Sequence, residues 1–261
     1  MKFKNITLMK KEQMRLQTST VRLMVEELGI EGFDNLHDYP HTPTFGDSHP
    51  NRIEVYTSHN RQLCSFESDW NFMKGKKVLL IPKQESRWST NTHTIKHYTS
   101  GIIRLSEFTH FGDYHFLVKM PDFIGAWGAC WLYGAPAFEL DFEQFSRNHC
   151  QRGHISAMQH WWNPDIPIST LGYHNIFKGK RFKVKAHKNP VLLSITWRPT
   201  YVTWFINGKE VYHSEINIPQ NPMECNIGQL QLRHFDNMWG QPWMLKNMKP
   251  MEIYGFKYVK L

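Results

Sequence analysis

Residues 137–145 read Ala137-Phe138-Glu139-Leu140-Asp141-Phe142-Glu143-Gln144-Phe145 and place three acidic residues at alternate positions of an apolar stretch. Successive side chains of a β-strand point to opposite faces, so Glu139, Asp141 and Glu143 are predicted to share one face. Acidic residues are poor strand formers, and like charges aligned on one face repel each other. The pattern therefore favours a chemical use for these acids.

The alternative explanation for this strand is a solvated face of an antiparallel sheet, where alternating acidic residues are common. The preceding segment Gly125-Ala126-Trp127-Gly128-Ala129-Cys130-Trp131-Leu132-Tyr133-Gly134 argues against it, because it is rich in glycine and aromatic residues. An indole face can stack on the apolar face of a sugar ring. Two carboxylates that flank one bond, one protonated and one ionised, are the groups that hydrolyse glycosidic bonds. The two segments together predict a sugar site.

Composition is that of a globular protein with one sizeable domain. The 261 residues are 41% hydrophobic and 14% aromatic, and the charged fraction of 21% argues against disorder. The formal net charge of +8 predicts attraction to anionic partners. Nucleic acid is not expected, because Lys and Arg are spread along the chain and no nucleic-acid motif is present. An acidic or sulfated polysaccharide suits the charge equally well.

Four cysteines, Cys64, Cys130, Cys150 and Cys225, are widely spaced and form no C-x-x-C pair, so a zinc site is not expected. No stretch is long and apolar enough to predict a membrane span. Residues 1–11 lack the continuous apolar core of a signal peptide, which leaves the localisation open. An enzyme that acts on polysaccharide meets its substrate outside the cytoplasm. We therefore expect either a removed leader or another route, such as release in a virus particle.

An N-terminal helix is predicted from about Lys10 to Leu28, with Gly29 as its C-terminal cap. Four apolar residues fall on one stripe of this helix: Val21, Met24, Val25 and Leu28. Packing of this stripe against the chain's own domain is favoured, and the alternative is docking onto a larger assembly. The chain is accordingly divided into an N-terminal helical extension, residues 1–35, and one β domain, residues 36–261.

Strand patterns separated by turn residues recur through the β domain. The clearest cover residues 78–81, 114–120, 191–197, 201–206 and 251–261. Asn207-Gly208 is a strong type I′ hairpin signal between the strand that ends at Ile206 and the residues that follow it. Many strands at hairpin spacing and one helix predict an all-β fold, a two-sheet antiparallel β-sandwich of the jelly-roll kind.

Together these segments resemble glycoside hydrolase family 16, the jelly-roll glucanases and galactanases of the concanavalin A-like superfamily. The resemblance covers roughly residues 50–261 and rests on five segments in a fixed order. Residues 98–103 resemble a Y-T-S-G strand, residues 111–121 a Y-G-x-x-E-x-R-x-K-x-P segment, residues 125–132 G-x-W-P-A-x-W-L, residues 139–143 E-[I/L]-D-x-E without a β-bulge, and residues 197–211 the W-x-P-x-x-I-x-W-Y-V-D-G-x-x-V hairpin.

The resemblance implies a catalytic role for each acid. Glu139 would be the nucleophile that forms a glycosyl-enzyme intermediate, Glu143 the acid and then the base, and Asp141 an assistant to the nucleophile. On a flat strand the Cα atoms of Glu139 and Glu143 lie about 13 Å apart. A retaining pair needs its carboxyl groups about 5–5.5 Å apart, so strand curvature and leaning side chains must close the gap.

The resemblance also suggests residues that hold the sugar. Trp127 and Trp131 are the candidates for stacking, His160 corresponds to a cleft histidine on a neighbouring strand, and Trp162 and Trp239 are candidates for the groove walls. No cofactor is required, and a structural calcium ion is compatible with the family.

Four departures from the family pattern bear on the substrate. The Glu and Arg of the Y-G segment are replaced by His115 and Leu117, the Pro between the paired Trp residues by Gly128, and a Trp two places before the nucleophile by Ala137. Asn207 replaces an Asp in the hairpin, and both residues suit that turn.

The leading hypothesis is a retaining endo-β-glycanase that hydrolyses β-1,3 or β-1,4 linkages of a glucan or galactan by double displacement. Its partner would be a polysaccharide, with no nucleic acid and no membrane. The alternative is a non-hydrolytic carbohydrate-binding or structural module, for example a phage virion component. Transglycosylation would follow from the same intermediate if a sugar hydroxyl arrived before water.

Overall fold

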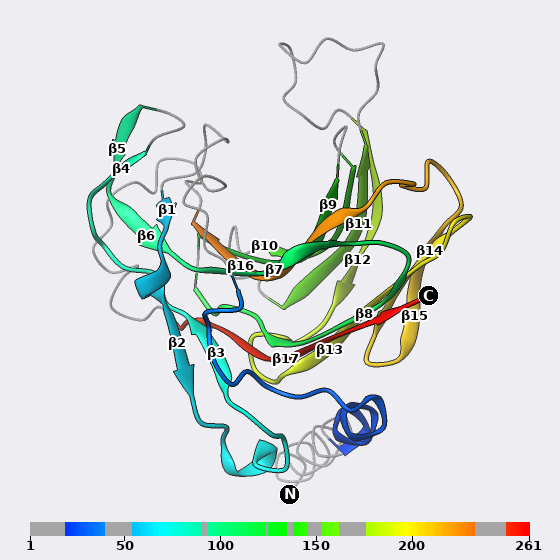
Figure 1. Ribbon diagram of the computed structural model, residues 1–261, viewed down its shortest axis with the longest axis horizontal. Helices are drawn as coiled ribbons and strands as arrows, with labels where there is room; N and C mark the ends of the chain where they lie inside the picture. The colour runs from blue at the N-terminus through cyan, green and yellow to red at the C-terminus, as the bar shows by residue number, and fades with distance from the viewer. Residues whose placement is uncertain are drawn as a thin grey trace, which may run out of the picture.

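The computed structural model describes residues 19–39, 54–89, 93–123, 125–134, 138–145, 153–161, 176–232 and 249–261. Two large sheets lie face to face over a common hydrophobic core (Figure 1). Neighbouring strands within each of them are antiparallel. The predicted all-β sandwich is confirmed.

The first sheet has six strands. In spatial order they are β12 (Ile176–Lys183), β11 (His154–Trp161), β10 (Phe138–Phe145), β9 (Ala126–Gly134), β16 (Met223–Leu232) and β7 (Ile102–Thr109). The acidic strand β10 therefore lies inside the sheet, between β9 and β11. Among the described strands, β12 lies at one edge.

The second sheet has seven strands. In spatial order they are β15 (Lys209–Ser214), β14 (Val202–Ile206), β13 (Val191–Trp197), β8 (Gly112–Lys119), β17 (Met251–Lys260), β3 (Lys77–Leu80) and β2 (Arg61–Cys64). Two small sheets pair β1 (Glu54–Tyr56) with β6 (Tyr98–Ser100) and β4 (Arg87–Ser89) with β5 (Thr94–Lys96). Two short 3₁₀ helices occupy Ser58–Asn60 and Ser68–Trp70.

The alternation predicted for β10 is present in the structure. Leu140 and Phe142 are fully buried in the core between the two sheets. Strand β10 pairs with β9 and with β11 without any register shift, so no bulge interrupts the alternation. Glu139, Asp141 and Glu143 consequently lie on the opposite, outer face of the first sheet.

The predicted hairpin is confirmed as well. Asn207 and Gly208 have φ angles of 50° and 73°, as a type I′ turn requires, and they connect β14 to β15. The side-chain Oδ1 of Asn207 also accepts a hydrogen bond of 2.9 Å from the backbone N–H of Leu192 on β13. Asn207 therefore adopts the turn conformation and also links the turn to β13 through its side chain.

Residues 19–28 are helical and lie on the outer face of the second sheet (Figure 1). A second core forms there, in which Val21 and Val25 pack with Leu117, Leu192 and Tyr254 of the sheet. The apolar stripe is thus used within the chain itself. Residues 10–18 of the predicted helix lie outside the described residues, and the division of the chain at residue 35 stays a prediction.

Cysteine chemistry does not contribute to the described fold. Cys64, Cys130 and Cys225 form no disulfide, and Cys150 lies outside the described residues. Burial raises the pKa of the Cys225 thiol well above its usual value. Within the described ranges, we find no helix with the length and hydropathy needed to span a membrane.

The helix contact generates a stability prediction. Val25→Ala removes buried methyl groups from a side chain that is 1% exposed, so it should lower the free energy of unfolding by about 2 kcal/mol. Leu23→Ala, on the same helix but 66% exposed, is the matched control and should change stability little. Chemical denaturation of both variants measures this. Equal effects would contradict packing of the helix on its own sheet.

A second prediction concerns pH. Burial alone would raise the pKa of Asp113, but hydrogen bonds from Arg198 and Thr196 outweigh it and hold the pKa below its usual range. The Arg198 Nη2 lies 2.9 Å from both carboxylate oxygens, and the Thr196 hydroxyl lies 2.7 Å from Oδ1. Because the folded pKa is depressed, this stabilisation is present at neutral pH and is lost as pH falls below about 4.

Asp113→Asn should therefore cost about 1–3 kcal/mol at pH 7, and its difference from wild type should shrink as pH falls below about 4. Denaturation midpoints at several pH values provide the measurement. Glu107→Gln is the control, since Glu107 is exposed. A gap that stays constant down to pH 2 would show that the charge of Asp113 does not matter.

Candidate active site

On the outer face of the first sheet, residues that lie opposite each other on β9, β10 and β11 form three rows, which run through Glu139, Asp141 and Glu143. Glu139 lies opposite Tyr133 of β9 and His160 of β11. Asp141 lies opposite Trp131 and Met158. Because directly opposed residues in antiparallel strands point to the same face, the predicted acids, Trp131 and His160 are brought together.

The central acid is the most buried member of the group. Asp141 is 1% exposed, and the Nε2 of His160 lies 3.0 Å from its Oδ2. Burying a carboxylate is costly unless it is paired or hydrogen-bonded. His160 is thus the side chain that lies against this buried carboxylate, and the contact brings the histidine of β11 next to the acidic strand.

Three of these residues also offer a compact set of metal ligands. Glu139, Asp141 and His160 each present one ligand atom, and the three atoms lie within 4.8 Å of one another. A set of one imidazole and two carboxylates suits a transition metal, whereas calcium prefers oxygen ligands throughout. This trio therefore does not supply the calcium site that the resemblance allows, and that expectation stays untested.

The outer acid, Glu143, is half-buried and lies opposite Ala129 of β9 and Ser156 of β11. The side chains directly opposite this carboxylate on both neighbouring strands are therefore small. Glu139 is likewise half-buried. Both outer acids thus reach the surface, whereas the acid between them does not. That difference fits two reacting groups and one supporting group.

The two tryptophans of β9 lie on the same face but expose little of their surface. Trp127 is 9% exposed and Trp131 is 6% exposed. The ring of Trp131 meets that of Tyr133 edge to face, with centroids 5.6 Å apart. Trp131 is therefore part of the packed floor beside Asp141, and only a small part of it can meet a sugar. Trp162 and Trp239 lie outside the described residues.

Strand β16 contributes residues that the sequence patterns do not predict. Asn226 lies opposite Trp131, and Glu224 lies opposite Tyr133, so both join the rows of the acids. Glu224 pairs with Arg104 of β7, whose Nη1 is 3.4 Å from its Oε2. Gln229, opposite Ala129, donates a hydrogen bond of 2.7 Å to the Tyr56 hydroxyl.

Strand β16 pairs irregularly between Glu224 and Gln229, with two register shifts against β7 and one against β9. The shift against β9 explains why Gln229 is hard to find, whereas Glu224 and Asn226 precede it and keep regular pairing with β9. The buried apolar residues change phase across this region: Met223, Cys225 and Ile227 before it, Leu230 and Leu232 after it. That change of phase is the sequence signal of a bulge. In such a strand the outward-facing residues before and after the bulge occupy positions of opposite parity in the sequence.

Two of the departures from the family pattern do not touch this face. His115 and Leu117 belong to β8 in the second sheet. Leu117 is buried in the core formed with the N-terminal helix, and His115 Nδ1 lies 2.9 Å from the Ser194 hydroxyl. Burial lowers the pKa of His115. These replacements therefore affect packing on the outer side of the sandwich, and the expectation that they bear on the substrate loses its basis.

The third departure, Gly128, is imposed by its neighbours. A Cβ added at Gly128 would lie 2.7 Å from the ring Cδ of Pro121 and 2.9 Å from Met120 Sδ. This chain packs Met120 and Pro121 into the space that a larger residue would need. Ala137 lies outside the described residues.

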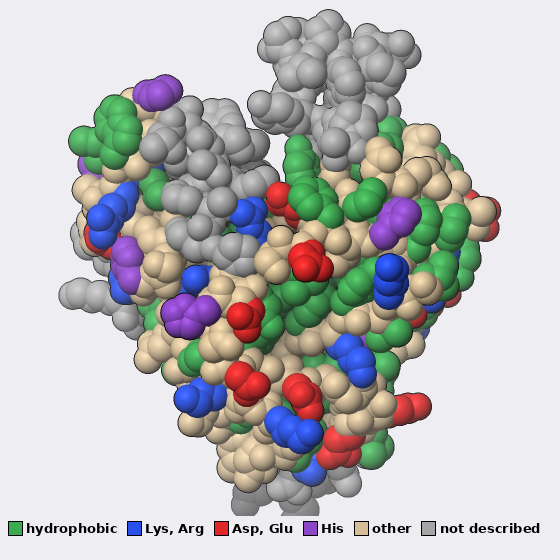
Figure 2. Space-filling model, viewed as in Figure 1, with side chains coloured by type: hydrophobic (Ala, Val, Ile, Leu, Met, Phe, Trp, Pro, Cys, Tyr) green, Lys and Arg blue, Asp and Glu red, His purple; other side chains and the backbone are tan. Residues whose placement is uncertain are grey.

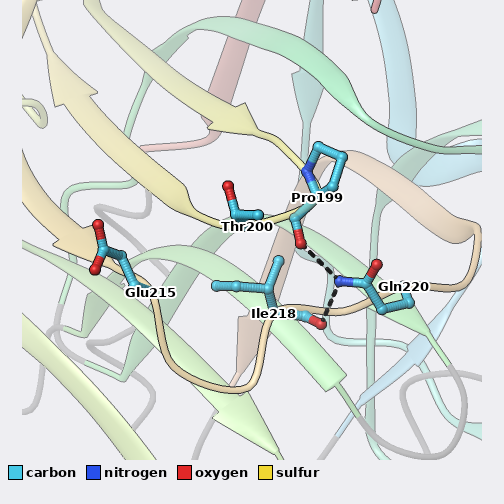
Figure 3. Close-up of a pocket in the computed structure, with 5 residues that line it drawn as sticks. All are labelled: Pro199, Thr200, Glu215, Ile218 and Gln220. Carbon is cyan, nitrogen blue, oxygen red and sulfur yellow. Dashed lines mark hydrogen bonds between the residues drawn. The ribbon is translucent and has the colours of Figure 1, made fainter.

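Figure 2 shows acidic side chains at the surface between the side that carries β4 and β5 and the side that carries β11 and β12. A separate open pocket of about 580 Å³ is lined by Pro199, Thr200, Glu215, Ile218 and Gln220 (Figure 3).

The pocket in Figure 3 does not fit the predicted chemistry. Gln220 Nε2 donates hydrogen bonds of 2.9 and 3.0 Å to the backbone oxygens of Pro199 and Ile218, which fix the two loops (Figure 3). Glu215 is the one carboxylate among the described lining residues. Glycosidic hydrolysis needs two carboxyl groups, so the face of β10 is the candidate active site.

A sandwich with a row of carboxylates beside aromatic side chains has the groups that a carbohydrate-active enzyme requires. The sequence model of the glycosyl hydrolases family 16 matches residues 66–242, which is more than half of the chain. The chain belongs to this family.

Individual relatives are distant. A beta-glucanase of Acetivibrio thermocellus is 22% identical over 155 residues, which are 59% of this chain and 42% of that protein. The chain therefore matches less than half of the length of this curated relative. A beta-1,3-1,4-glucanase (lichenase) from a mouse hindgut metagenome has a TM-score of 0.64 at 15% identity, covering 89% of this chain and 98% of the lichenase. LamAcat from Zobellia galactanivorans has a TM-score of 0.61 at 19% identity, covering 85% and 90%. These structures share the fold.

The contact at Gly128 can be tested by one substitution. Gly128→Ala should destabilise the protein by about 1–3 kcal/mol, because the added methyl group overlaps a buried proline ring that cannot rotate away. Thermal unfolding measures the change. An unaltered melting temperature would contradict the tight packing of Pro121 against β9.

Proposed function

We propose that this protein is a retaining endo-β-glycanase that hydrolyses β-1,3 or β-1,4 linkages of a glucan. The observation that carries the proposal is the uninterrupted strand β10, which presents Glu139, Asp141 and Glu143 on one face inside the first sheet. Membership of glycosyl hydrolases family 16 supports it. The relatives named beta-glucanase and lichenase favour a glucan, and galactan is the alternative substrate.

In the first step, a carboxylate oxygen of Glu139 attacks the anomeric carbon and forms a covalent bond to the sugar. The bond between that carbon and the glycosidic oxygen breaks, and the Glu143 carboxyl group gives its proton to the departing oxygen. Glu143 is then ionised. The released product is the part of the polysaccharide on the leaving side.

In the second step, the Glu143 carboxylate takes a proton from water, and the water oxygen attacks the same anomeric carbon. The bond to Glu139 breaks and both residues return to their starting forms. Each step inverts the configuration of the carbon. Two inversions give net retention.

Asp141 and His160 support these two reaction steps by their positions beside the reacting groups. In this proposal Asp141, which lies between the reacting acids on the same face of β10, assists Glu139 during attack. The Nε2 of His160 lies 3.0 Å from Asp141 Oδ2, and this contact keeps the histidine beside the acids. Trp131 and Tyr133 pack beside them and form the floor under the sugar. Trp127, Trp162 and Trp239 stay predicted sugar contacts.

A non-hydrolytic carbohydrate-binding module is the competing function. A module needs the aromatic residues but has no need of three aligned carboxylates, of which one is buried against a histidine. Docking of the N-terminal helix on a larger particle gains no support from its described residues, since their apolar stripe packs on the second sheet. The virion role therefore stays outside the proposal.

Glu139→Gln and Glu143→Gln should each lower kcat on a barley or algal β-glucan by about 10³-fold or more, because each removes a reacting group. Glu210→Gln, an exposed acid on β15, is the control and should keep full activity. Release of reducing ends is the measurement, and circular dichroism verifies the fold of each variant.

The configuration of the first product distinguishes double displacement, which retains the configuration of the anomeric carbon, from a single displacement, which inverts it. Proton NMR during early hydrolysis should show the β-anomer of the new reducing end before mutarotation. An α-anomer as first product would contradict double displacement. If the wild type and both variants bind a glucan or galactan but none of them hydrolyses it, the protein is a non-hydrolytic carbohydrate-binding module.

A further inference from the structure

Strand β12 and the turn after it carry an unusual concentration of positive charge. Residues 176–188 contain six Lys or Arg side chains and no Asp or Glu, in a chain of formal net charge +8. These six are Lys178, Lys180, Arg181, Lys183, Lys185 and Lys188, and all are exposed. The even spread of cations expected from the sequence therefore does not hold at this edge.

No ion pair neutralises these cations within the part of the chain that the structure describes. Elsewhere many basic side chains are paired, as Lys77 is with Glu252, Lys119 with Glu252 and Arg198 with Asp113. Lysines on an edge strand are one known way to prevent another strand from adding there. That explanation accounts for some charge on β12 but not for its distribution between the two faces.

The register assigns each cation of β12 to a face. Arg181 lies opposite Ser156, which lies opposite Glu143, so the three share the outer face of the sheet. Lys183, opposite His154, points to the same side. Lys178 and Lys180 lie opposite Gln159 and Ala157 and therefore belong to the other face.

Arg181 is also oriented toward the candidate active site. Its Nε lies 3.5 Å from the Ser156 hydroxyl, so the guanidinium leans over β11 toward the row of Glu143. Two strand spacings separate the backbones of Arg181 and Glu143, which is about 10 Å. A substituent bound by Arg181 would therefore belong to a sugar close to the one being cleaved.

We propose that Arg181 and Lys183 form a subsite for an anionic substituent of the polysaccharide, a carboxylate or a sulfate ester, at the β12 side of the active site. The inference rests on the proposed glycanase function and names its substrate class as an acidic glycan. A guanidinium can bind two oxygens of either group side by side, and a neighbouring ammonium adds a second positive charge.

The acids on β10 favour such a glycan over nucleic acid. A polymer with a charge on every unit would bring negative groups against Glu139, Asp141 and Glu143, where like charges repel. A glycan with spaced anionic groups can place a neutral ring over the acids and a charge over β12. The arrangement of negative β10 and positive β12 matches that spacing.

The test compares one β-glucan in three forms: neutral, carboxymethylated and sulfated to the same degree. Wild type should have a higher kcat/KM on at least one charged form, and the preference should decline between about 0.05 and 0.5 M salt. In Arg181→Gln/Lys183→Gln the ratio of charged to neutral kcat/KM should fall about tenfold. The two charged forms show whether carboxylate or sulfate is the group recognised.

Lys178→Gln/Lys180→Gln is the matched control, with the same change in charge on the other face of the same strand, and should keep the wild-type ratio. Equal loss in both double variants would show a diffuse charge effect and overturn the subsite. Loss in neither variant would overturn it as well and leave edge protection as the explanation.

Binding to the inactive Glu139→Gln protein separates this inference from the proposed function. Calorimetry with the neutral and charged glucans should show the same dependence on Arg181 and Lys183 even if no glucan is hydrolysed. If the wild type hydrolyses neutral glucan and binds the charged forms no better, the subsite fails while the proposed function stands. Binding of duplex DNA as tight as that of the charged glucan would also overturn it.

Discussion

The register of strand β10 is the constraint on which the site depends. Its side chains alternate with a period of two, so a slip of one residue would turn Leu140 and Phe142 to the outside and drive three carboxylates into the core. The cost of burying those charges is far larger than any gain from a different pairing. The same apolar residues that hold the two sheets together therefore fix the positions of Glu139, Asp141 and Glu143.

Neighbouring strands complete the site by different means. Strands β9 and β11 pair with β10 in regular register and place Trp131 and His160 beside Asp141. Strand β16 pairs regularly with β9 as far as Asn226 and then shifts its register, so that Gln229 reaches a position that regular alternation would not give it. The second sheet and the N-terminal helix stay behind this face and supply stability.

The sequence predicts those strands that are defined by their own residues and by the turns next to them. β10, the β13–β15 hairpins and the terminal strand β17 follow from alternation and turn residues, and the helix stripe follows from its spacing. His160 is different, because its contact with Asp141 depends on the register between two strands and enters the prediction only through the resemblance to a family. Gln229 of β16 is missed because a register shift before it breaks the alternation.

Two further features show why a linear pattern is insufficient. His115 and Leu117 stand where the family pattern has charged residues, yet the topology places β8 in the sheet behind the site. The cations of residues 176–188 are visible in the sequence, but only the pairing of β12 with β11 divides them between the site and the opposite face. In both cases the function of a side chain depends on which sheet and which face its strand occupies.

Covalent trapping of the intermediate tests the central claim most directly. A 2-fluoro β-glycoside of a short glucan oligosaccharide with a good leaving group should inactivate the enzyme, because fluorine slows both steps and the leaving group speeds only the first. Mass mapping of the digested protein should then find the sugar on Glu139, in the peptide that contains β10. A label on Glu143, or on any residue outside β10, would contradict the assignment of this strand as the catalytic one.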